Sequence, residues 1–326
     1  MPFTEHMPPA DASREMKRAW IDTDMGFDDL AAVLTVTQTL PWRVDGMSLV
    51  AGNAPLEVVV DNALRSAAFF DWDFPIHAGS AGPLAGELVT AQAILGADAM
   101  ASAGRSLPRA RGPLASSDAV AALIDYLSAA TEPAAVLALG PLTNIAIVLQ
   151  TRPDLATRIG QLMWMGGSAG PGNHTAAAEF NAAVDPEAIN AVLDAGAALR
   201  MVGLDACRQV RVHASDAEAL RAIGSDKADV LADLLLGYVR IASPAGALPM
   251  SLYDPTAAAA LVAPEGLLRF RPAHVVAECK GEHTRGMTVV EWRVPKRAEA
   301  NAQVASVADE AGLRRVVLDA LARAAR

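Results

Sequence analysis

The chain has 326 residues, of which 52% are hydrophobic and 20% are charged. This composition supplies enough apolar side chains for a large core and excludes an intrinsically disordered chain. Lys and Arg number 27 against 37 Asp and Glu, so the net charge is −10. Because nucleic acids and anionic membranes are bound through clustered positive charge, neither is expected as the main partner.

Two cysteines, Cys207 and Cys279, are too few for a disulfide framework, and a reducing cytoplasm suits them. Residues 1–17 have mixed charge and no apolar run, so we expect a loose tail before a single domain over residues 18–326. The uncharged stretch 133–151 is long enough to suggest a membrane span. Because glycine, proline and polar residues interrupt it, we interpret it as a strand, a turn and a helix.

Short apolar runs alternate with glycine turns and helical stretches along the chain. In chain order, the runs predicted as strands are 19–21, 47–50, 135–139, 162–165 and 199–204, with helices at 30–40, 56–70 and 143–150. This alternation predicts an α/β fold whose mostly parallel, Rossmann-like sheet is flanked by helices. Such sheets bind ligands beyond the carboxyl ends of their strands, so the polar residues there are the candidates for function.

Four carboxylates follow the first predicted strand within eight residues: Asp22, Asp24, Asp28 and Asp29. One or two of them could cap the next helix, but four at a buried strand end repel one another unless a cation lies among them. Oxygen ligands favour calcium or magnesium. The fifth and twelfth positions, Gly26 and Val33, exclude an EF-hand loop. Phosphatases with an Asp nucleophile also have D-x-D after a strand, but that alternative would leave Asp28 and Asp29 unexplained.

The stretch Asp22–Asp29 resembles the D-x-D-x-x-x-D-D signature of the inosine-uridine preferring nucleoside hydrolases. The likeness continues in the family's order to the end of the chain. It includes Val50–Asn53, Leu139–Asn144, Met165–Gly167, Gly172-Asn173, Ala178–Asn181, Asp185–Ala188, Asp254-Pro255 and Thr284–Val290. The resemblance implies an enzyme that hydrolyses the N-glycosidic bond of ribonucleosides to give ribose and a free base. It also implies a homodimer or a homotetramer.

The resemblance further implies a role for individual residues. A calcium ion would be held by Asp24, Asp29, the backbone carbonyl of Leu139 and Asp254. Asp24 would be the general base for a calcium-bound water, and Asn181 and Tyr253 are the other catalytic candidates. The ribose hydroxyls would be held by Asp28, Asn53, Asn173, Glu179 and Asn181.

These residue types suit the reaction, because N-glycosidic cleavage develops positive charge near C1′ that carboxylates stabilise. Asn and Glu side chains supply the donors and acceptors that ribose hydroxyls need. Some motifs also have a purely structural interpretation. Gly52-Asn53 and Gly172-Asn173 are common turn dipeptides. Asp254-Pro255 and Asp185-Pro186 both suit a helix start, and for Asp185 we prefer that interpretation.

The family's pattern includes histidines that protonate or stabilise the leaving base. This chain departs from the pattern at both of these positions. Much of the family has a histidine before the late D-P, where this chain has Tyr253. Other members have a histidine in an I-H-G segment, where this chain has Leu95. Both usual imidazoles are therefore absent.

Several explanations of this departure are open. Tyr253 could donate a hydrogen bond to the base, since a phenol with a pKa near 10 stays protonated. Trp164, Phe180 or Tyr238 could instead stack on the base. The natural substrate could also be a different ribosyl compound, or the protein could bind nucleosides or ribose without catalysis. Among the histidines, His174 directly follows the Gly172-Asn173 motif and could contact the ligand.

A serine hydrolase is a weaker alternative. Gly166–Gly170 matches G-x-S-x-G, but that motif needs a helix directly after the serine, and Pro171 and Gly172 follow instead. The same glycines do not form a dinucleotide-binding fingerprint.

Two segments are rich in glycine, proline and small residues: 79–114, here called the first mouth segment, and 239–252, the second mouth segment. We expect both to flank the pocket mouth and to move. Because the departures fall in these regions, the sequence does not choose between purine and pyrimidine bases.

Overall fold

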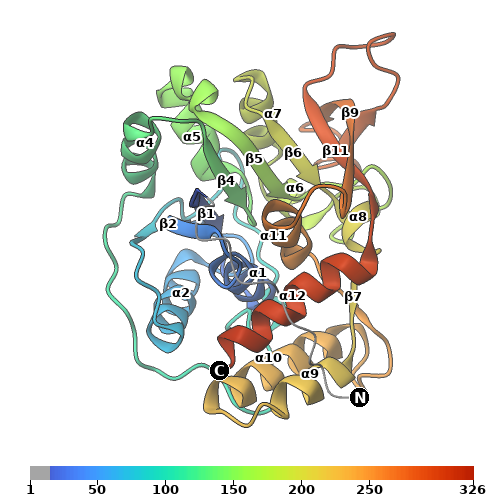
Figure 1. Ribbon diagram of the computed structural model, residues 1–326. Coiled ribbons are helices and arrows are strands. Elements are labelled where there is room, and N and C mark those ends of the chain that lie inside the picture. The colour runs from blue at the N-terminus through green and yellow to red at the C-terminus, as the bar shows by residue number, and fades with distance from the viewer. Residues whose placement is uncertain (1–14) are drawn as a thin grey trace.

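The computed structural model describes residues 15–326, and Figure 1 shows their arrangement. The tail expected over residues 1–17 lies outside the described residues except for its last three. Of these, Lys17 is already the first residue of strand β1.

The central sheet has nine strands in the order β10-β9-β11-β6-β5-β4-β1-β2-β3. Their bounds are β1 Lys17–Thr23, β2 Trp42–Leu49, β3 Ile76–Ala78, β4 Ala134–Ala138, β5 Ile159–Met165, β6 Leu199–Val202, β9 Leu268–Ala277, β10 Thr288–Glu291 and β11 Ala302–Ala308. From β3 across to β11 all neighbouring strands are parallel. At the other edge β9 pairs antiparallel with β11 and β10. The predicted α/β fold with a mostly parallel sheet is confirmed.

Helices connect the strands, and β7 (Arg211–Val212) and β8 (Met250–Ser251) form a separate ribbon. The helices are α1 Phe27–Thr37, α2 Leu56–Phe70, α3 Gln92–Leu95, α4 Ala119–Ala129, α5 Thr143–Thr151, α6 Phe180–Val184, α7 Pro186–Asp194, α8 Leu204–Cys207, α9 Ala214–Arg221, α10 Asp226–Ala242, α11 Asp254–Val262 and α12 Glu310–Ala324, with a 3₁₀ turn at Pro153–Arg158. The stretch 133–151 forms β4, a turn and α5, as predicted. Within residues 15–326, no helix combines the length and the apolar character needed to cross a membrane.

The sheet separates two hydrophobic layers. Successive side chains of a strand point to opposite faces, so Ile21 and Trp20 of β1 enter different cores. Ile21 belongs to the cluster that includes residues of α1, α2, α10, α11 and α12, and Trp20 belongs to the one that includes residues of α4, α5 and α7. In Figure 1, α10 and α12 lie toward the bottom, whereas α4, α5 and α7 lie toward the top. The fold is thus one three-layer domain.

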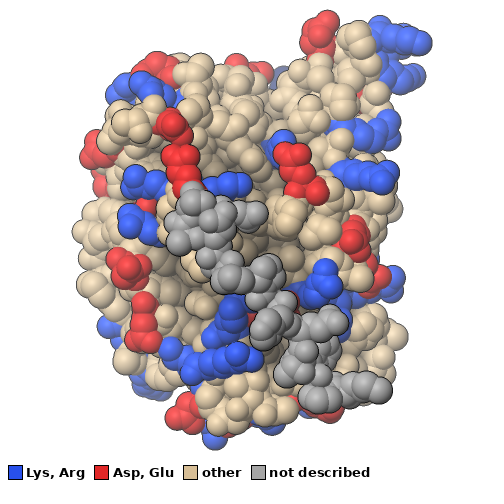
Figure 2. Space-filling model, in the orientation of Figure 1, with Lys and Arg blue, Asp and Glu red and all other residues tan. Residues whose placement is uncertain are grey.

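Four neighbouring parallel strands end at the same edge of the sheet, which brings the candidate residues together. β1 leads to Asp24, β2 to Asn53, β4 to Leu139 and β5 to Gly166. On the face of the molecule shown in Figure 2, Lys and Arg side chains are interspersed with Asp and Glu.

Candidate active site

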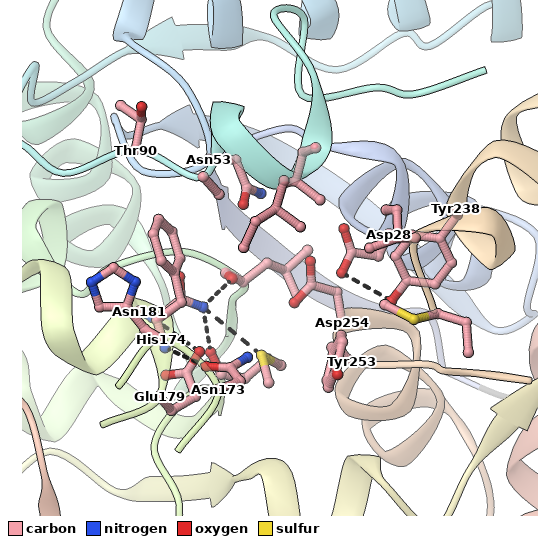
Figure 3. Close-up of a pocket in the computed structure, with 18 of the residues that line it drawn as sticks. Asp28, Asn53, Thr90, Asn173, His174, Glu179, Asn181, Tyr238, Tyr253 and Asp254 are labelled. Carbon is pink, nitrogen blue, oxygen red and sulfur yellow. Dashed lines mark hydrogen bonds between the residues drawn. The ribbon is translucent and has the colours of Figure 1, made fainter. Parts of the chain in front are cut away.

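A cavity of about 490 Å³ opens at this edge of the sheet. Most of the predicted site residues line it: Asp28, Asn53, Leu139, Asn173, Glu179, Asn181, Tyr253 and Asp254. The remaining two, Asp24 and Asp29, are 1% and 0% exposed and do not form part of the lining surface. Figure 3 shows side chains from distant parts of the chain converging on this space.

Three carboxylates lie close enough to share a cation. Asp28 and Asp29 are in the first turn of α1, and Asp254 begins α11. One oxygen of each lies within 4.8 Å of an oxygen of the other two. Aligned helix N-termini favour negative charge at this position. The cluster supplies only oxygen atoms, which is the donor set of a hard divalent cation.

The electrostatics of these carboxyl groups also favour a cation. Burial raises the pKa of Asp24 and Asp254 well above their usual range, and repulsion from neighbouring carboxylates raises both further. Burial and the charge of Asp29 raise the pKa of Asp28 to about 7. Without a counter-charge burial favours the protonated form of these groups, whereas a bound cation keeps them ionised.

Asn53 joins Asp24 to the carboxylate cluster. Its backbone N–H donates to Asp24 Oδ2 at 2.7 Å, and its side-chain amide donates to Asp24 Oδ1 and Asp29 Oδ2, each at 3.1 Å. A Cβ at the preceding Gly52 would lie 2.2 Å from Asp24 Oδ2, so only glycine allows this approach. Asp29 also accepts from Thr23 Oγ1 at 2.5 Å and from the backbone N–H of Gly26 at 2.7 Å.

Asp22 does not join the other carboxylates, which corrects the argument that all four share one cation. Its Oδ1 accepts hydrogen bonds from the Ser48 hydroxyl and from Asn144 Nδ2, the latter at 2.8 Å. Burial raises its pKa to about 7. Asp22 lies inside β1, one residue before its end, so its side chain is held between β2 and the start of α5. Its role is therefore structural.

A second polar group lies across the cavity at the start of α6. Glu179 caps this helix, and its carboxylate accepts from the backbone N–H groups of Gly167, Asn181 and Ala182 at 2.7 to 3.0 Å. Burial raises its pKa to about 7. The Asn181 amide donates to the backbone carbonyls of Leu139 and Met165 at 2.8 and 3.0 Å. Asn181 thus links the group at α6 to the end of β4.

The aromatic residues named for the leaving base divide into two kinds. Phe180, Tyr238 and Tyr253 line the cavity. Trp164 does not: it is fully buried and its Nε1 donates to the Gly140 carbonyl at 3.1 Å, so the suggestion that it stacks on the base is wrong. Burial raises the pKa of Tyr253, which keeps the phenol protonated. The Tyr238 hydroxyl donates to the Ser251 carbonyl at 2.8 Å and lies 3.5 Å from Asp28 Oδ2.

Several of the sequence motifs lie outside the cavity and make structural contacts. Asp185 caps α7 by accepting from the Ala188 N–H at 3.0 Å, as its structural interpretation predicted. The Arg285 guanidinium pairs with Glu187 at 2.7 and 2.8 Å. The Thr288 hydroxyl bonds both backbone groups of Ser168, and no helix follows Ser168 before α6, which rules out the serine elbow.

Both mouth segments contribute to the cavity wall, which confirms that they flank it. The first contributes Thr90, Ala91, Ala93, Ile94 and Leu95, and the second contributes Ile241 and Met250. Three further lining residues, Thr90, Met165 and Ile241, were not among the predicted site residues. Ile241 follows Tyr238 by three residues on α10, so helical spacing could have placed it beside that tyrosine.

The chain matches the family described as "Inosine-uridine preferring nucleoside hydrolase" over residues 19–315. It is 36% identical to the pyrimidine-specific ribonucleoside hydrolase RihA of Shewanella woodyi over 295 residues, covering 90% of this chain and 94% of that one. It is 37% identical to the non-specific ribonucleoside hydrolase RihC of Salmonella enteritidis over 304 residues, covering 93% and 97%.

Solved structures show the same fold. A purine-preferring ribonucleoside hydrolase from Gardnerella vaginalis superposes with a TM-score of 0.86 at 24% identity, covering 95% of this chain and 99% of that one. The plant nucleoside hydrolase PpNRh1 superposes with a TM-score of 0.83 at 27% identity, covering 94% and 99%. Sequence and structure agree, and the chain belongs to the inosine-uridine preferring nucleoside hydrolase family.

Proposed function

We propose that the protein hydrolyses the N-glycosidic bond of ribonucleosides to ribose and free base, with Asp24 as general base and calcium as its metal. The observation that carries the proposal is the pairing of two groups in one cavity. The carboxylates Asp28, Asp29 and Asp254 lie within 4.8 Å of one another, and the polar group of Asn173, Glu179 and Asn181 lines the same space.

The donor set fits a calcium ion. We assign Asp24, Asp29, the Leu139 carbonyl and Asp254 as its ligands, and Asp28 is close enough to the same position to contribute. The Leu139 carbonyl accepts one hydrogen bond, from Asn181, and keeps a second lone pair. When bound, the ion would lower the pKa of water and orient the ribose hydroxyls.

The remaining chemistry belongs to side chains. Asp24 accepts the proton of the attacking water, and the amide donors of Asn53 hold its carboxylate in one orientation. Carboxylates on one side of the sugar stabilise the positive charge that develops at C1′. Asp28, Asn53, Asn173, Glu179 and Asn181 hold the ribose hydroxyls, which fixes the sugar for attack.

Tyr253 is the proposed donor to the leaving base. It lines the cavity, directly precedes Asp254, and is held protonated by burial. This assignment favours catalysis over the alternative of a nucleoside-binding protein, because Tyr253 stands directly before Asp254-Pro255, the sequence position of the absent histidine.

The test is release of reducing sugar from purine and pyrimidine nucleosides and from p-nitrophenyl riboside, before and after chelation of metal. Both purine and pyrimidine nucleosides are tested, because one relative is named as pyrimidine-specific and the other as non-specific. Calcium-dependent turnover of nucleosides is the expected result. Turnover of the activated riboside alone would indicate a different natural substrate. Binding without any turnover would favour the binding protein.

We also propose a cytoplasmic homodimer or homotetramer. Light scattering should give a multiple of the 33.9 kDa chain mass. A mass equal to one chain would contradict the oligomer.

A further inference from the structure

The turn between β1 and α1 has a strained backbone at Met25. This residue has a φ of +38°, in the left-handed region that residues other than glycine seldom adopt. It stands between Asp24, the proposed general base, and Gly26, and its side chain is fully buried. Such a conformation persists only where the surrounding contacts hold it. The contacts made by Met25 therefore help to fix the turn that carries the first carboxylates of the site.

One of these contacts comes from Asn62 of α2. The Asn62 side chain is buried, and its Nδ2 donates to the Met25 carbonyl at 3.0 Å. This carbonyl and the Gly26 N–H belong to one planar trans peptide unit, so they point in opposite directions. The Gly26 N–H donates to Asp29 Oδ2 at 2.7 Å. Through a single peptide unit, Asn62 thus orients a donor that holds a proposed metal ligand.

The same nitrogen of Asn62 also holds the first mouth segment. It donates to the Asp98 carbonyl at 2.7 Å, and an amide nitrogen carries the two hydrogens that both bonds require. The next residue, Ala99, is buried with a φ of +51°, and a Cβ at Gly26 would lie 3.2 Å from its carbonyl oxygen. In the part of the chain that the structure describes, Met25 and Ala99 are two of three non-glycine residues with a positive φ. One amide therefore bridges two strained turns.

We propose that Asn62 is a positioning residue that couples the first mouth segment to the metal-binding turn. Its amide holds Met25 in the conformation that directs the Gly26 N–H to Asp29. Without that amide the buried Met25 carbonyl loses this donor and the turn is free to relax, so the carboxylate cluster loses affinity for calcium. The inference rests on the calcium site of the proposed function and adds to it a residue that lies outside the cavity lining.

Coupling of this kind is reciprocal. If the contact at Asp98 stabilises the metal-binding form of the turn, calcium binding must stabilise that contact in return. Calcium without any nucleoside should therefore slow amide hydrogen exchange in residues 96–100. These residues neither line the cavity nor belong to the carboxylate cluster, so direct contact with a ligand would not explain the change.

The experiment is a calorimetric titration of calcium into the unaltered protein, Asn62→Leu and Asn190→Leu. Leucine keeps the branched shape of asparagine but has no hydrogen-bond donor. For Asn62→Leu we expect the calcium dissociation constant to rise roughly tenfold, as it does when a partner that orients metal ligands is removed. Because Asn190 of α7 is partly buried, donates to the Ala277 carbonyl at 2.9 Å and lies outside the cavity lining, it is the matched control. Its variant should lower the melting temperature and leave the calcium dissociation constant within about twofold.

An unchanged calcium affinity in Asn62→Leu would overturn the inference. So would an equal loss of affinity in both variants, because reduced stability would then be the cause. If Asn62→Leu does not fold, hydrogen exchange of the unaltered protein decides. Calcium should slow exchange in residues 96–100 by about fivefold, and unaltered exchange there would contradict the coupling. If the unaltered protein binds no calcium, the calcium assignment of the proposed function fails as well, so the two failures are distinguishable.

Discussion

Asp24 follows the end of β1 and is buried, outside the cavity lining. It is 1% exposed, both of its oxygens receive hydrogen bonds from Asn53, and a Cβ at Gly52 would lie 2.2 Å from its Oδ2. A general base contributes about 10² to 10⁴ to the rate. The Asp24→Asn variant should therefore lose about 10³-fold in kcat, measured as reducing-sugar release.

The new amide would also face a donor of Asn53, so the melting temperature should be recorded with the rate. Asp226→Asn is the control for charge, because the Asp226 side chain is 93% exposed and lies on the surface. If Asp24→Asn keeps more than a tenth of the activity, Asp24 is not the base.

Tyr253 is tested by varying the leaving group. A donor to the base matters most where the base leaves poorly, and p-nitrophenolate leaves without help. Tyr253→Phe should lower kcat by about tenfold on inosine or uridine and by less than about threefold on p-nitrophenyl riboside. A uniform reduction across these substrates would show that the hydroxyl does not assist departure of the base.

Many individual site residues could be predicted from the sequence because they directly follow the ends of predicted strands. Asp24, Asn53 and Leu139 come after three strands that are adjacent in the sheet, so they had to meet. Asp22 was assigned to the wrong environment because a motif gives spacing but not side-chain direction within the last residues of a strand. Trp164 was misplaced for the same reason, since β5 directs it into the core.

Two helices, α1 and α11, shape the metal-binding side of the cavity by placing their N-termini together. The two helices pack against each other, which fixes Asp28 and Asp29 relative to Asp254. The mouth segments, in contrast, are mostly loops and short elements, although the second begins in the last turn of α10, and Ile94 in the first remains 65% exposed. Such segments open more readily than packed helices.

Ligand binding should therefore order the mouth segments. We expect slower amide hydrogen exchange, by about tenfold, in residues 79–114 and 239–252 when Asp24→Asn is saturated with inosine. Exchange in α12, which lies outside the cavity lining, should stay unchanged. Unaltered exchange in both mouth segments would contradict the expected movement.

The parallel part of the fold was predictable because its strands are apolar runs followed by turns. The antiparallel edge formed by β9, β10 and β11 was not predicted. In β9, exposed Arg269 and Arg271 interrupt the apolar pattern. The short edge strand β10 pairs only with residues 274–277, so this part of β9 has a strand on one side only, which tolerates them. Edge strands carry a weaker hydrophobic signal because only part of their surface is buried.

At the level of the whole molecule, the carboxylate cluster couples metal binding to stability. A cation that binds only the folded state stabilises it by mass action, by about 2.7 kcal/mol at 100 times its dissociation constant. Chelation should therefore lower the melting temperature by roughly 5 °C. Asp254→Asn should remove most of this difference, and an equal chelation effect in that variant would place the ion elsewhere.

The distance along the chain between the two halves of the carboxylate cluster has a consequence for biosynthesis. Asp28 and Asp29 leave the ribosome early, whereas their partner is residue 254 of 326. Until that residue emerges, the nascent chain contains Asp24, Asp28 and Asp29 but lacks the Asp254 carboxylate that completes the cluster. Synthesis proceeds from the N-terminus at about 5–20 residues per second, so the site stays incomplete for roughly ten seconds or more. The ion is therefore acquired by a nearly finished protein, and a chain terminated before residue 254 would have no complete place to hold it.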